Sequence, residues 1–368
     1  MVGPKAIIHL DRLIHNYRII KDHLNHAPVM AVVKANGYGH GAVECAKILE
    51  QEGCTYFAVF TFTEALELRK AGIQSNILIF SKLQPEFLDQ AILQNITLNI
   101  SDPKDIDLLQ NYYSTHSHCP AFHIKIDTGM TRLGISFEVI GDVLKKLSEN
   151  SHLNCEGIYS HYATADEGDL SYAKWQLDRF KLVLSLANEM GVELKVKHFS
   201  NSGAVLNLPD SAFDIVRVGM LLYGVYPSDE VPRNVAIKPV MEFKGPIVEK
   251  RQIKAGIKVS YGGEWEAGND TTIGVIQTGF ADGFPRPWYH GGYVVYRGKK
   301  YLIAGRICMD QFMVDFDHDD VTVGDEVLFF GEYGENSLPM EEIAQNIGMT
   351  PYVIATGIHG RTERIYKK

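Results

Sequence analysis

A lysine at the end of an apolar run is the first residue whose position suggests chemistry. Lys34 follows the stretch VMAVV and precedes the glycine-rich ANGYGHG, within residues 29–41. Lysine is rarely buried without a partner, and burial lowers the pKa of its ammonium toward that of a nucleophilic amine. Such an amine could form a Schiff base with an aldehyde cofactor. Alternatively, the side chain could follow the surface and place its tip in solvent.

Two later turns contain the groups of an anion-binding site. The stretch HFSNSGA offers Ser202 and the backbone amides around Gly203, where a helix would begin. The stretch VRVGMLLYG contains Gly219, which lets a ligand approach the backbone closely, so the Gly219 and Met220 amides could complete the same site. Each stretch could also be an ordinary turn, but the two together, after neighbouring strands, favour a phosphate site.

Charged side chains also interrupt segments that are otherwise typical of buried strands. Arg217 lies within the apolar run IVRVG, where an arginine needs an acceptor, either a carboxylate or a neutral ring nitrogen. The stretch KIDTGMTRLGI brings Lys125, Asp127 and Arg132 close together in the chain. This group indicates either a functional site or an internal salt bridge beside an exposed arginine.

Two further residues allow a structural as well as a functional interpretation. His161 follows the apolar run EGIYS and could be a core histidine with satisfied hydrogen bonds. Tyr261 in VSYGGEW follows a predicted strand beside two glycines, and most such tyrosines are packing residues.

The elements that must position these residues alternate regularly between residues 29 and 224. Short β-branched runs alternate with amphipathic stretches such as 41–53, 61–72 and 169–191, which predicts βαβ units and a parallel sheet. The predicted strands are residues 29–34, 56–60, 76–80, 96–100, 122–127, 154–160, 196–200 and 215–219. Eight units in about 200 residues favour a (β/α)8 TIM-type barrel, with an open doubly wound sheet as the alternative. Barrel enzymes carry their sites at the carboxyl ends of the strands, where the polar residues above are predicted to lie.

The pattern changes near residues 227–239. Strand-like runs with glycine turns then dominate, apart from one short helical pattern at 340–348. We therefore expect a barrel domain over residues 8–232 and a C-terminal β domain over residues 233–368, against which residues 1–7 pack.

Composition excludes several classes of function. The 368 residues carry a formal net charge of -9 without a long basic run, which argues against nucleic-acid binding. No stretch reaches the roughly 18–20 apolar residues of a membrane span, and the first residues do not form a signal peptide. The five cysteines lack C-x-x-C spacing, so neither a metal site nor a disulfide framework is predicted. We expect a cytoplasmic protein without membrane or nucleic-acid partners.

Taken together, the motifs resemble those of the alanine racemase family. In order they are AVVKANGYGHG, KIDTGMTRLGI, EGIYSHYATAD, HFSNSGA, VRVGMLLYG, VSYGGEW, FADGFPR and GRICMDQ, and they cover nearly the whole chain. The resemblance implies the fold-type III arrangement of pyridoxal 5'-phosphate (PLP) enzymes, with a (β/α)8 barrel followed by a β domain. It also implies a head-to-tail homodimer with shared active sites. Its activity would be the interconversion of L- and D-alanine, which supplies D-alanine for peptidoglycan.

The resemblance also implies residue roles. Lys34 would bind PLP covalently and act as one catalytic base, and Tyr261 from the other subunit would be the second. The implied cofactor-binding residues are Lys34, Tyr38, His161, Asn201, Ser202, Arg217, Gly219, Met220 and Tyr352. Within this set Tyr38 would bind the phosphate, Arg217 would face the pyridine nitrogen, and His161 would support Arg217.

The substrate carboxylate would lie near Arg132, Met309 and Asp310, the last two across the dimer. Lys125 matches a lysine that is often carbamylated in this family and that holds Arg132 in place. No metal is implied.

Three positions depart from the family pattern. Phe280 replaces a tyrosine in GFADG, Tyr352 lies in PYV rather than N-Y-E, and Gly37 is a change without expected effect. The first two leave substrate size and access open, so a racemase of serine or of several amino acids is an alternative. A fold-type III decarboxylase, a non-catalytic PLP carrier and a sugar-phosphate barrel enzyme without PLP are others, although VSYGGEW favours a racemase.

Overall fold

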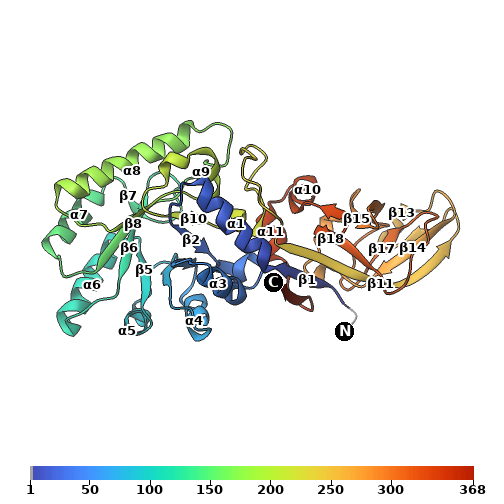
Figure 1. Ribbon diagram of the computed structural model, residues 1–368, viewed down its shortest axis with the longest axis horizontal. Coiled ribbons are helices and arrows are strands. Elements are labelled where there is room, and N and C mark those ends of the chain that lie inside the picture. Colours follow the sequence, from blue (N-terminus) through green and yellow to red (C-terminus); the bar gives the residue numbers. More distant parts are fainter. Residues whose placement is uncertain (1–2) are drawn as a thin grey trace.

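The N-terminal part of the chain is a barrel of parallel strands, which confirms the fold predicted from the alternating pattern (Figure 1). This computed structural model describes residues 3–368. The strands, in spatial order, are β10 (Val216–Val218), β2 (Val29–Val32), β3 (Tyr56–Val59), β4 (Asn76–Ile79), β5 (Ile96–Ile100), β6 (Phe122–Asp127), β8 (Cys155–Tyr159) and β9 (Val196–His198), with β7 (Ile135–Ser136) beside β6. Backbone hydrogen bonds of 3.0 Å from Asp214 N to Lys197 O and from Arg217 N to Ser200 O close the barrel between β9 and β10.

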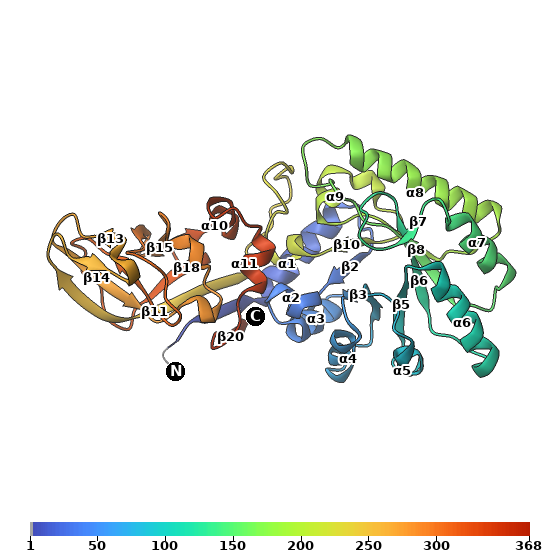
Figure 2. The same ribbon diagram turned by 180° about the vertical axis from the view of Figure 1, so that it is seen from behind.

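Helices cover the outside of the barrel, because each buries one apolar face against the strands (Figure 2). They are α1 (Leu10–His23), α3 (Ala42–Gln51), α4 (Phe62–Lys70), α5 (Leu88–Leu93), α6 (Pro103–His116), α7 (Ile140–Glu149), α8 (Ser171–Glu189) and α9 (Ser202–Asn207). The short α2 (Lys34–Tyr38) belongs to the site described below. The strands β2 and β3 are buried on both faces, as parallel strands between helices and a filled interior must be.

The C-terminal part is built mainly from antiparallel strands. Its main sheet has the order β16-β15-β18-β11-β1-β20. Its strands are β11 (Met241–Ile253), β12 (Lys258–Val259), β13 (Trp265–Glu266), β14 (Thr271–Ile276), β15 (Tyr293–Tyr296), β16 (Lys299–Leu302), β17 (Phe312–Asp315), β18 (Glu326–Tyr333), β19 (Asn336–Leu338) and β20 (Glu363–Lys367), together with β1 (Lys5–His9). The expected helix is α10 (Met340–Asn346); a second, α11 (Pro351–Thr356), was not predicted.

β1 lies inside this sheet, antiparallel to β11 and parallel to β20. β1 and β20 are therefore neighbours in the sheet, although almost the whole described chain separates them in sequence.

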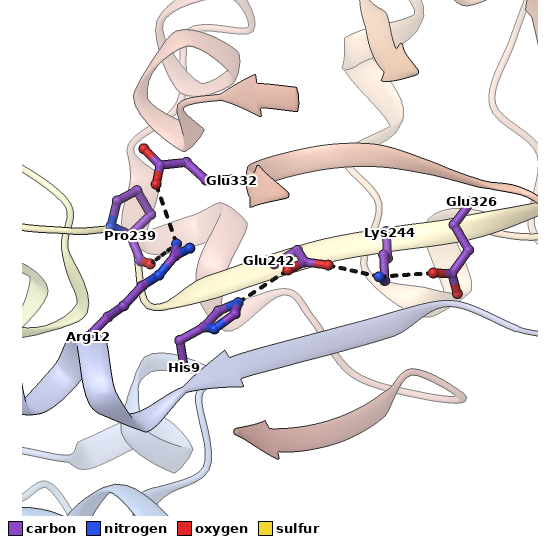
Figure 3. Close-up of polar contacts among 7 residues, drawn as sticks. All are labelled: His9, Arg12, Pro239, Glu242, Lys244, Glu326 and Glu332. Atoms are coloured by element: carbon purple, nitrogen blue, oxygen red, sulfur yellow. Dashed lines mark hydrogen bonds and ion pairs between the residues drawn. The ribbon is translucent and has the colours of Figure 1, made fainter. Parts of the chain in front are cut away.

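Charged side chains pair along β1, β11 and β18, three neighbouring strands of this sheet. Figure 3 draws two sets of contacts, one formed by His9, Glu242, Lys244 and Glu326, and one in which Arg12 on α1 contacts Pro239 O and Glu332. Glu242 has a side chain only 1% exposed, and it pairs with Lys244 Nζ at 2.9 Å and with His9 Nε2 at 3.1 Å. Lys244 also pairs with Glu326 at 2.9 Å. Burial alone would raise the pKa of Glu242, but the hydrogen bonds from His9 and Lys244 lower it.

The structure also bears on the predictions about membrane spans and cysteines. Within residues 3–368, no helix combines the length and apolar character needed to span a membrane. All five cysteines are free thiols.

Candidate active site

A cavity of about 300 Å³ opens where β2, β9 and β10 end. It is lined by Val32, Lys34, Tyr38, Phe80, Arg132, His161, Asp166, Asn201, Ser202, Gly203, Arg217, Gly219, Pro227 and Tyr352. A neighbouring cavity of about 420 Å³ shares Lys34, Arg132, His161 and Arg217 with it and adds Lys125. Most of the residues singled out from the barrel sequence therefore meet at one place.

Lys34 enters this cavity from a turn of unusual conformation. The strand predicted to end at Lys34 stops at Val32, because the chain then leaves the ladder and turns. The next four residues, Ala35 to Tyr38, have φ values of 50°, 53°, 62° and 52°. A left-handed turn costs roughly 1–2 kcal/mol for each non-glycine residue, so the surroundings must stabilise it. It directs both Lys34 and Tyr38 into the cavity.

The electrostatic surroundings make the Lys34 amine easier to deprotonate. Burial lowers its pKa, the nearby cations Arg132 and Arg217 lower it further, and Glu64 acts in the opposite direction. The Glu64 carboxylate also accepts a 2.7 Å hydrogen bond from Ala35 N, at the start of the turn.

Hydroxyl groups and closely approaching backbone form one end of the cavity. Ser202 Oγ accepts a 3.2 Å hydrogen bond from Gly219 N, and Asn201 Oδ1 accepts from Ala204 N at 3.0 Å. A Cβ at Gly219 would lie 2.6 Å from the Tyr38 hydroxyl oxygen, so only glycine leaves this space. Burial raises the pKa of Tyr38, which keeps its hydroxyl a hydrogen donor. The arrangement suits an oxyanion such as phosphate.

Arg217 is held by acceptors on two neighbouring strands. One guanidinium nitrogen donates to His198 Nδ1 at 2.9 Å, and the other to Ser160 O at 2.7 Å, Phe199 O at 2.9 Å and His161 Nδ1 at 3.1 Å. Burial lowers the pKa of Arg217 to about 10, so it stays charged at neutral pH and only donates. Burial and Arg217 lower the pKa of both histidines, whose Nδ1 atoms act as acceptors. The sequence left a carboxylate or a neutral ring nitrogen open as the acceptor for Arg217. The structure shows ring nitrogens, together with backbone carbonyls.

Lys125 completes a cluster of cations. Burial, Arg132, Arg217 and Lys34 lower its pKa to about 7. Asp127 forms no ion pair with it; its carboxylate accepts from Gly129 N at 2.9 Å and Thr131 N at 3.0 Å and so orders the loop that carries Arg132. Across residues 3–368, no carboxylate forms a salt bridge with any of the four cations Lys34, Lys125, Arg132 and Arg217.

Three predicted site residues lie elsewhere, on the β domain. Tyr261 is 72% exposed and Met309 is 56% exposed, and neither they nor Asp310 line the barrel cavity. Asp310 pairs with Arg361 at 2.8 Å, and Arg361 also binds the buried Asp282 at 2.9 Å, which ties two loops of this domain together. Within a single chain these residues do not meet Lys34.

The remaining two residues lie close to the cavity. Met220 is fully buried, directly after Gly219. Tyr352 on α11 lies over the cavity with its ring centre 5.8 Å from that of Tyr38, and burial raises its pKa to about 12. The C-terminal part of the chain thus contributes one wall of the barrel cavity.

Sequence reasoning missed His198 and Asp166. His198 opens the HFSNSGA motif, yet its contact with Arg217 arises only when β9 and β10 lie side by side. Asp166 ends the YATAD stretch and lines the cavity beside Gly203. The motif strings contained both residues, but no spacing rule assigned them a role.

Comparisons with known proteins agree along the whole chain. Two family models match it, "Alanine racemase, N-terminal domain" over residues 8–227 and "Alanine racemase, C-terminal domain" over residues 240–366. The chain is 39% identical over 363 residues to an alanine racemase of Carboxydothermus hydrogenoformans, covering 98% of each chain. It is 37% identical over 366 residues to that of Desulforamulus reducens, again covering 98% of each.

Solved structures of alanine racemases match the fold of this chain over its whole length. The alanine racemase of Clostridium difficile 630 matches with a TM-score of 0.94 at 36% identity, covering 100% of this chain and 96% of that one. The Bacillus anthracis alanine racemase with bound L-Ala-P matches with a TM-score of 0.92 at 32% identity, with the same coverage. On full-length similarity in sequence and fold, with a cationic cavity at the barrel mouth, this chain belongs to the alanine racemase family of isomerases.

Proposed function

We propose that the chain interconverts L- and D-alanine with PLP as its cofactor and so supplies D-alanine for peptidoglycan. One observation carries the proposal: an amine with a lowered pKa, Lys34, shares a cavity with a hydroxyl-lined anion site and with the donor Arg217. PLP has the complementary groups, namely an aldehyde, a phosphate and a ring nitrogen. The unpaired cations and the space that a Cβ at Gly219 would fill support this fit.

The phosphate would be bound at the hydroxyl-lined end. Tyr38, Ser202 and the backbone of Gly219 and Met220 would surround it, while Asn201 holds the start of α9 in place. Tyr352 would close the cavity from the β domain.

Arg217, supported by His161 and His198, would face the pyridine nitrogen. Because a guanidinium only donates, it would leave that nitrogen unprotonated. When bound, PLP supplies an electron sink that makes a proton on the substrate's Cα removable.

The protein must move that proton from one face of Cα to the other. Lys34 would bind the cofactor's aldehyde covalently at rest and, once free, take or return the proton on one face. The opposite face needs a second base, and we assign it to Tyr261 of the partner subunit, as the family resemblance of VSYGGEW implies. Its exposure and its position outside its own cavity support this assignment. Arg132 would bind the substrate carboxylate, beside Met309 of the partner subunit and Asp310 of the partner subunit. The active form would thus be a head-to-tail homodimer.

Lys125 would hold Arg132 in place. Its pKa of about 7 leaves a fraction of the amine neutral, which carbamylation requires. A carbamate on Lys125 would add the negative charge that this cluster of cations lacks. Mass spectrometry of the native protein, compared with Lys125→Ala, measures this modification.

Shared active sites predict that two inactive variants restore each other. Lys34→Ala and Tyr261→Ala should each abolish racemisation as homodimers. After co-refolding in equal amounts, half of the dimers should be mixed, and each should contain one complete site, giving about a quarter of wild-type activity. Circular dichroism of L-alanine over time provides the assay. A mixture that stays inactive while mixed dimers are present would exclude a shared site.

Substrate range depends on the walls of the cavity. Tyr352 keeps its ring at the cavity, but its neighbours Pro351 and Val353 and the residue Phe280 depart from the family pattern. We propose alanine as the main substrate and serine as the first alternative to assay.

Two further assignments complete the proposal. We place the protein in the cytoplasm, which its five free thiols support. We divide the chain into a barrel over residues 8–232 and a β domain over residues 233–368. Of the residues 1–7 that we assign to the latter, residues 1–2 lie outside the part of the chain that the structure describes.

A further inference from the structure

The left-handed turn between Lys34 and Tyr38 needs restraints from outside its own residues. Ala35, Asn36 and Tyr38 have positive φ without being glycine, a conformation that L-residues rarely adopt in succession. The turn's amides are tied locally: Gly37 N donates to Val33 O at 2.8 Å. The Gly37 carbonyl accepts from His40 N at 3.0 Å, so it is above all the Tyr38 carbonyl that needs a further donor.

His40 supplies this donor. Its Nδ1 lies 3.1 Å from Gly37 O and 2.9 Å from Tyr38 O. Because a carbonyl oxygen only accepts, Nδ1 must carry the ring's hydrogen and share it between the two carbonyls. The imidazole is fully buried and stacks on Tyr223, with ring centres 4.4 Å apart. The ring therefore has little freedom to release either carbonyl.

The second ring nitrogen faces a different environment. Nε2 is buried and has no hydrogen-bond partner among the described residues. The ring borders a cavity of about 20 Å³ between the barrel and the β domain, which Tyr223, Met241, Phe330 and Glu341 also line. That space suits a single water, which could donate to Nε2. Burial lowers the pKa of His40 to about 4, so the ring is neutral at physiological pH.

The β domain packs against the same turn from the other side. A Cβ at Gly39 would lie 2.1 Å from Ala355 O, on α11. Arg364 Nε donates to Gly39 O at 2.7 Å. Arg364 and the buried ring of His40 thus fix the carbonyls of three successive residues, Gly37, Tyr38 and Gly39.

We propose that His40, as a neutral Nδ1–H tautomer, is a positioning residue that directs Lys34 and Tyr38 into the cavity by holding the carbonyls of the left-handed turn. His40 touches neither cofactor nor substrate; it acts through the turn. The inference rests on the proposed function only in that PLP is the group these two side chains bind.

Two substitutions separate the hydrogen bond from the packing. His40→Phe keeps an aromatic ring against Tyr223 but removes the donor. His40→Asn loses the stacking but can donate from an amide placed like Nδ1. Equilibrium dialysis of the apoprotein against PLP should give a Kd about tenfold higher for His40→Phe, the loss of one buried hydrogen bond. His40→Asn should restore much of that affinity.

Kinetics at saturating PLP give a second readout. In His40→Phe, kcat should fall because Lys34 is misplaced, while the KM for alanine should stay near the wild-type value because Arg132 lies on another loop. A purely structural role would instead lower the Tm of both variants and leave the PLP affinity of the folded fraction unchanged, which would overturn the proposal.

A third readout uses the wild-type apoprotein and needs neither PLP nor a variant. The ¹⁵N shifts of the His40 imidazole should report hydrogen on Nδ1 and an acceptor at Nε2; the opposite tautomer would overturn the proposal even if His40→Phe fails to fold. If wild-type protein does not bind PLP, the proposed function fails while this tautomer measurement still tests the turn. If wild type binds PLP and racemises alanine but His40→Phe matches it, only the present inference fails.

Discussion

Two charge clusters in this molecule, each with buried members, follow opposite rules. In the main sheet of the β domain, Glu242 and Lys244 are almost fully buried and each has ion-pair partners within the chain. At the barrel mouth, four basic side chains gather and no carboxylate among the described residues forms an ion pair with them: Lys34, Lys125, Arg132 and Arg217. Burying a charge is costly unless it is paired. The charges of the sheet cluster are therefore paired within the chain, whereas the barrel mouth is organised for anions from outside it.

The largest expected effect comes from removing a basic group at the barrel mouth. Lys34→Ala should lower racemisation by at least about 10⁴-fold, because it removes both a covalent contact and a base. It should not lower the Tm of the apoprotein, because the amine has no carboxylate partner to lose. Activity assays and calorimetry test both parts. Lys146→Ala, on the outer helix α7, is the control and should leave activity unchanged.

The matching change in the β-domain sheet should affect stability instead. Glu242→Gln leaves Lys244 buried with one partner fewer, so the free energy of unfolding in urea should fall by about 3 kcal/mol. Glu332→Gln is the matched control: that side chain is 46% exposed and lies 3.4 Å from Arg12, and the loss should stay below about 1 kcal/mol. Equal losses in the two variants would contradict the comparison.

The two clusters should also respond to pH in different windows. Glu242 has a lower pKa in the folded protein than in the unfolded chain. Its contribution to stability is therefore present above the unfolded pKa of about 4.5 and is lost as the pH falls through the lower, folded pKa. Lys125 has a folded pKa of about 7, below its unfolded pKa of about 10.5. Between these two pH values the native state binds fewer protons than the unfolded chain, so stability should rise with pH. The slope should stay under about 1.4 kcal/mol per pH unit. Urea denaturation of wild type and Lys125→Met across this range measures it; an unchanged slope in the variant would contradict the assignment.

The smallest expected effect is protection of the apoprotein by an anion. Inorganic phosphate at several times its Kd should raise the free energy of unfolding by about 1 kcal/mol through binding at the hydroxyl-lined end of the cavity. Tyr38→Phe should weaken this protection, whereas Glu332→Gln should not. Equal protection of all three proteins would point to a general salt effect.

Much of the fold followed from local patterns. The predicted strands 96–100 and 122–127 coincide with β5 and β6, because β-branched runs between amphipathic stretches are buried on both faces. The short α11 escaped prediction, since six residues beginning with proline show no periodicity. Its place over the cavity depends on the way the β domain packs against the barrel.

The site was harder to predict where it depends on contacts distant in the sequence. The residue types at 35–38 gave no warning of four left-handed residues in succession, because the restraints come from His40 and from the other domain. The role of His198 required β9 and β10 to be adjacent. The role of Tyr261 depends on a second copy of the chain, and its assignment stays a prediction.

The position of β1 between β11 and β20 has a consequence for the order of folding. The main sheet of the second domain pairs residues 5–9 with residues 241–244 and 363–367, so it depends on contacts very distant in the sequence. Arg364, which donates to Gly39 O beside the lysine turn, lies on β20. The barrel can form from contacts between neighbouring βα units, but the turn that presents Lys34 gains this restraint only once β20 has joined the sheet.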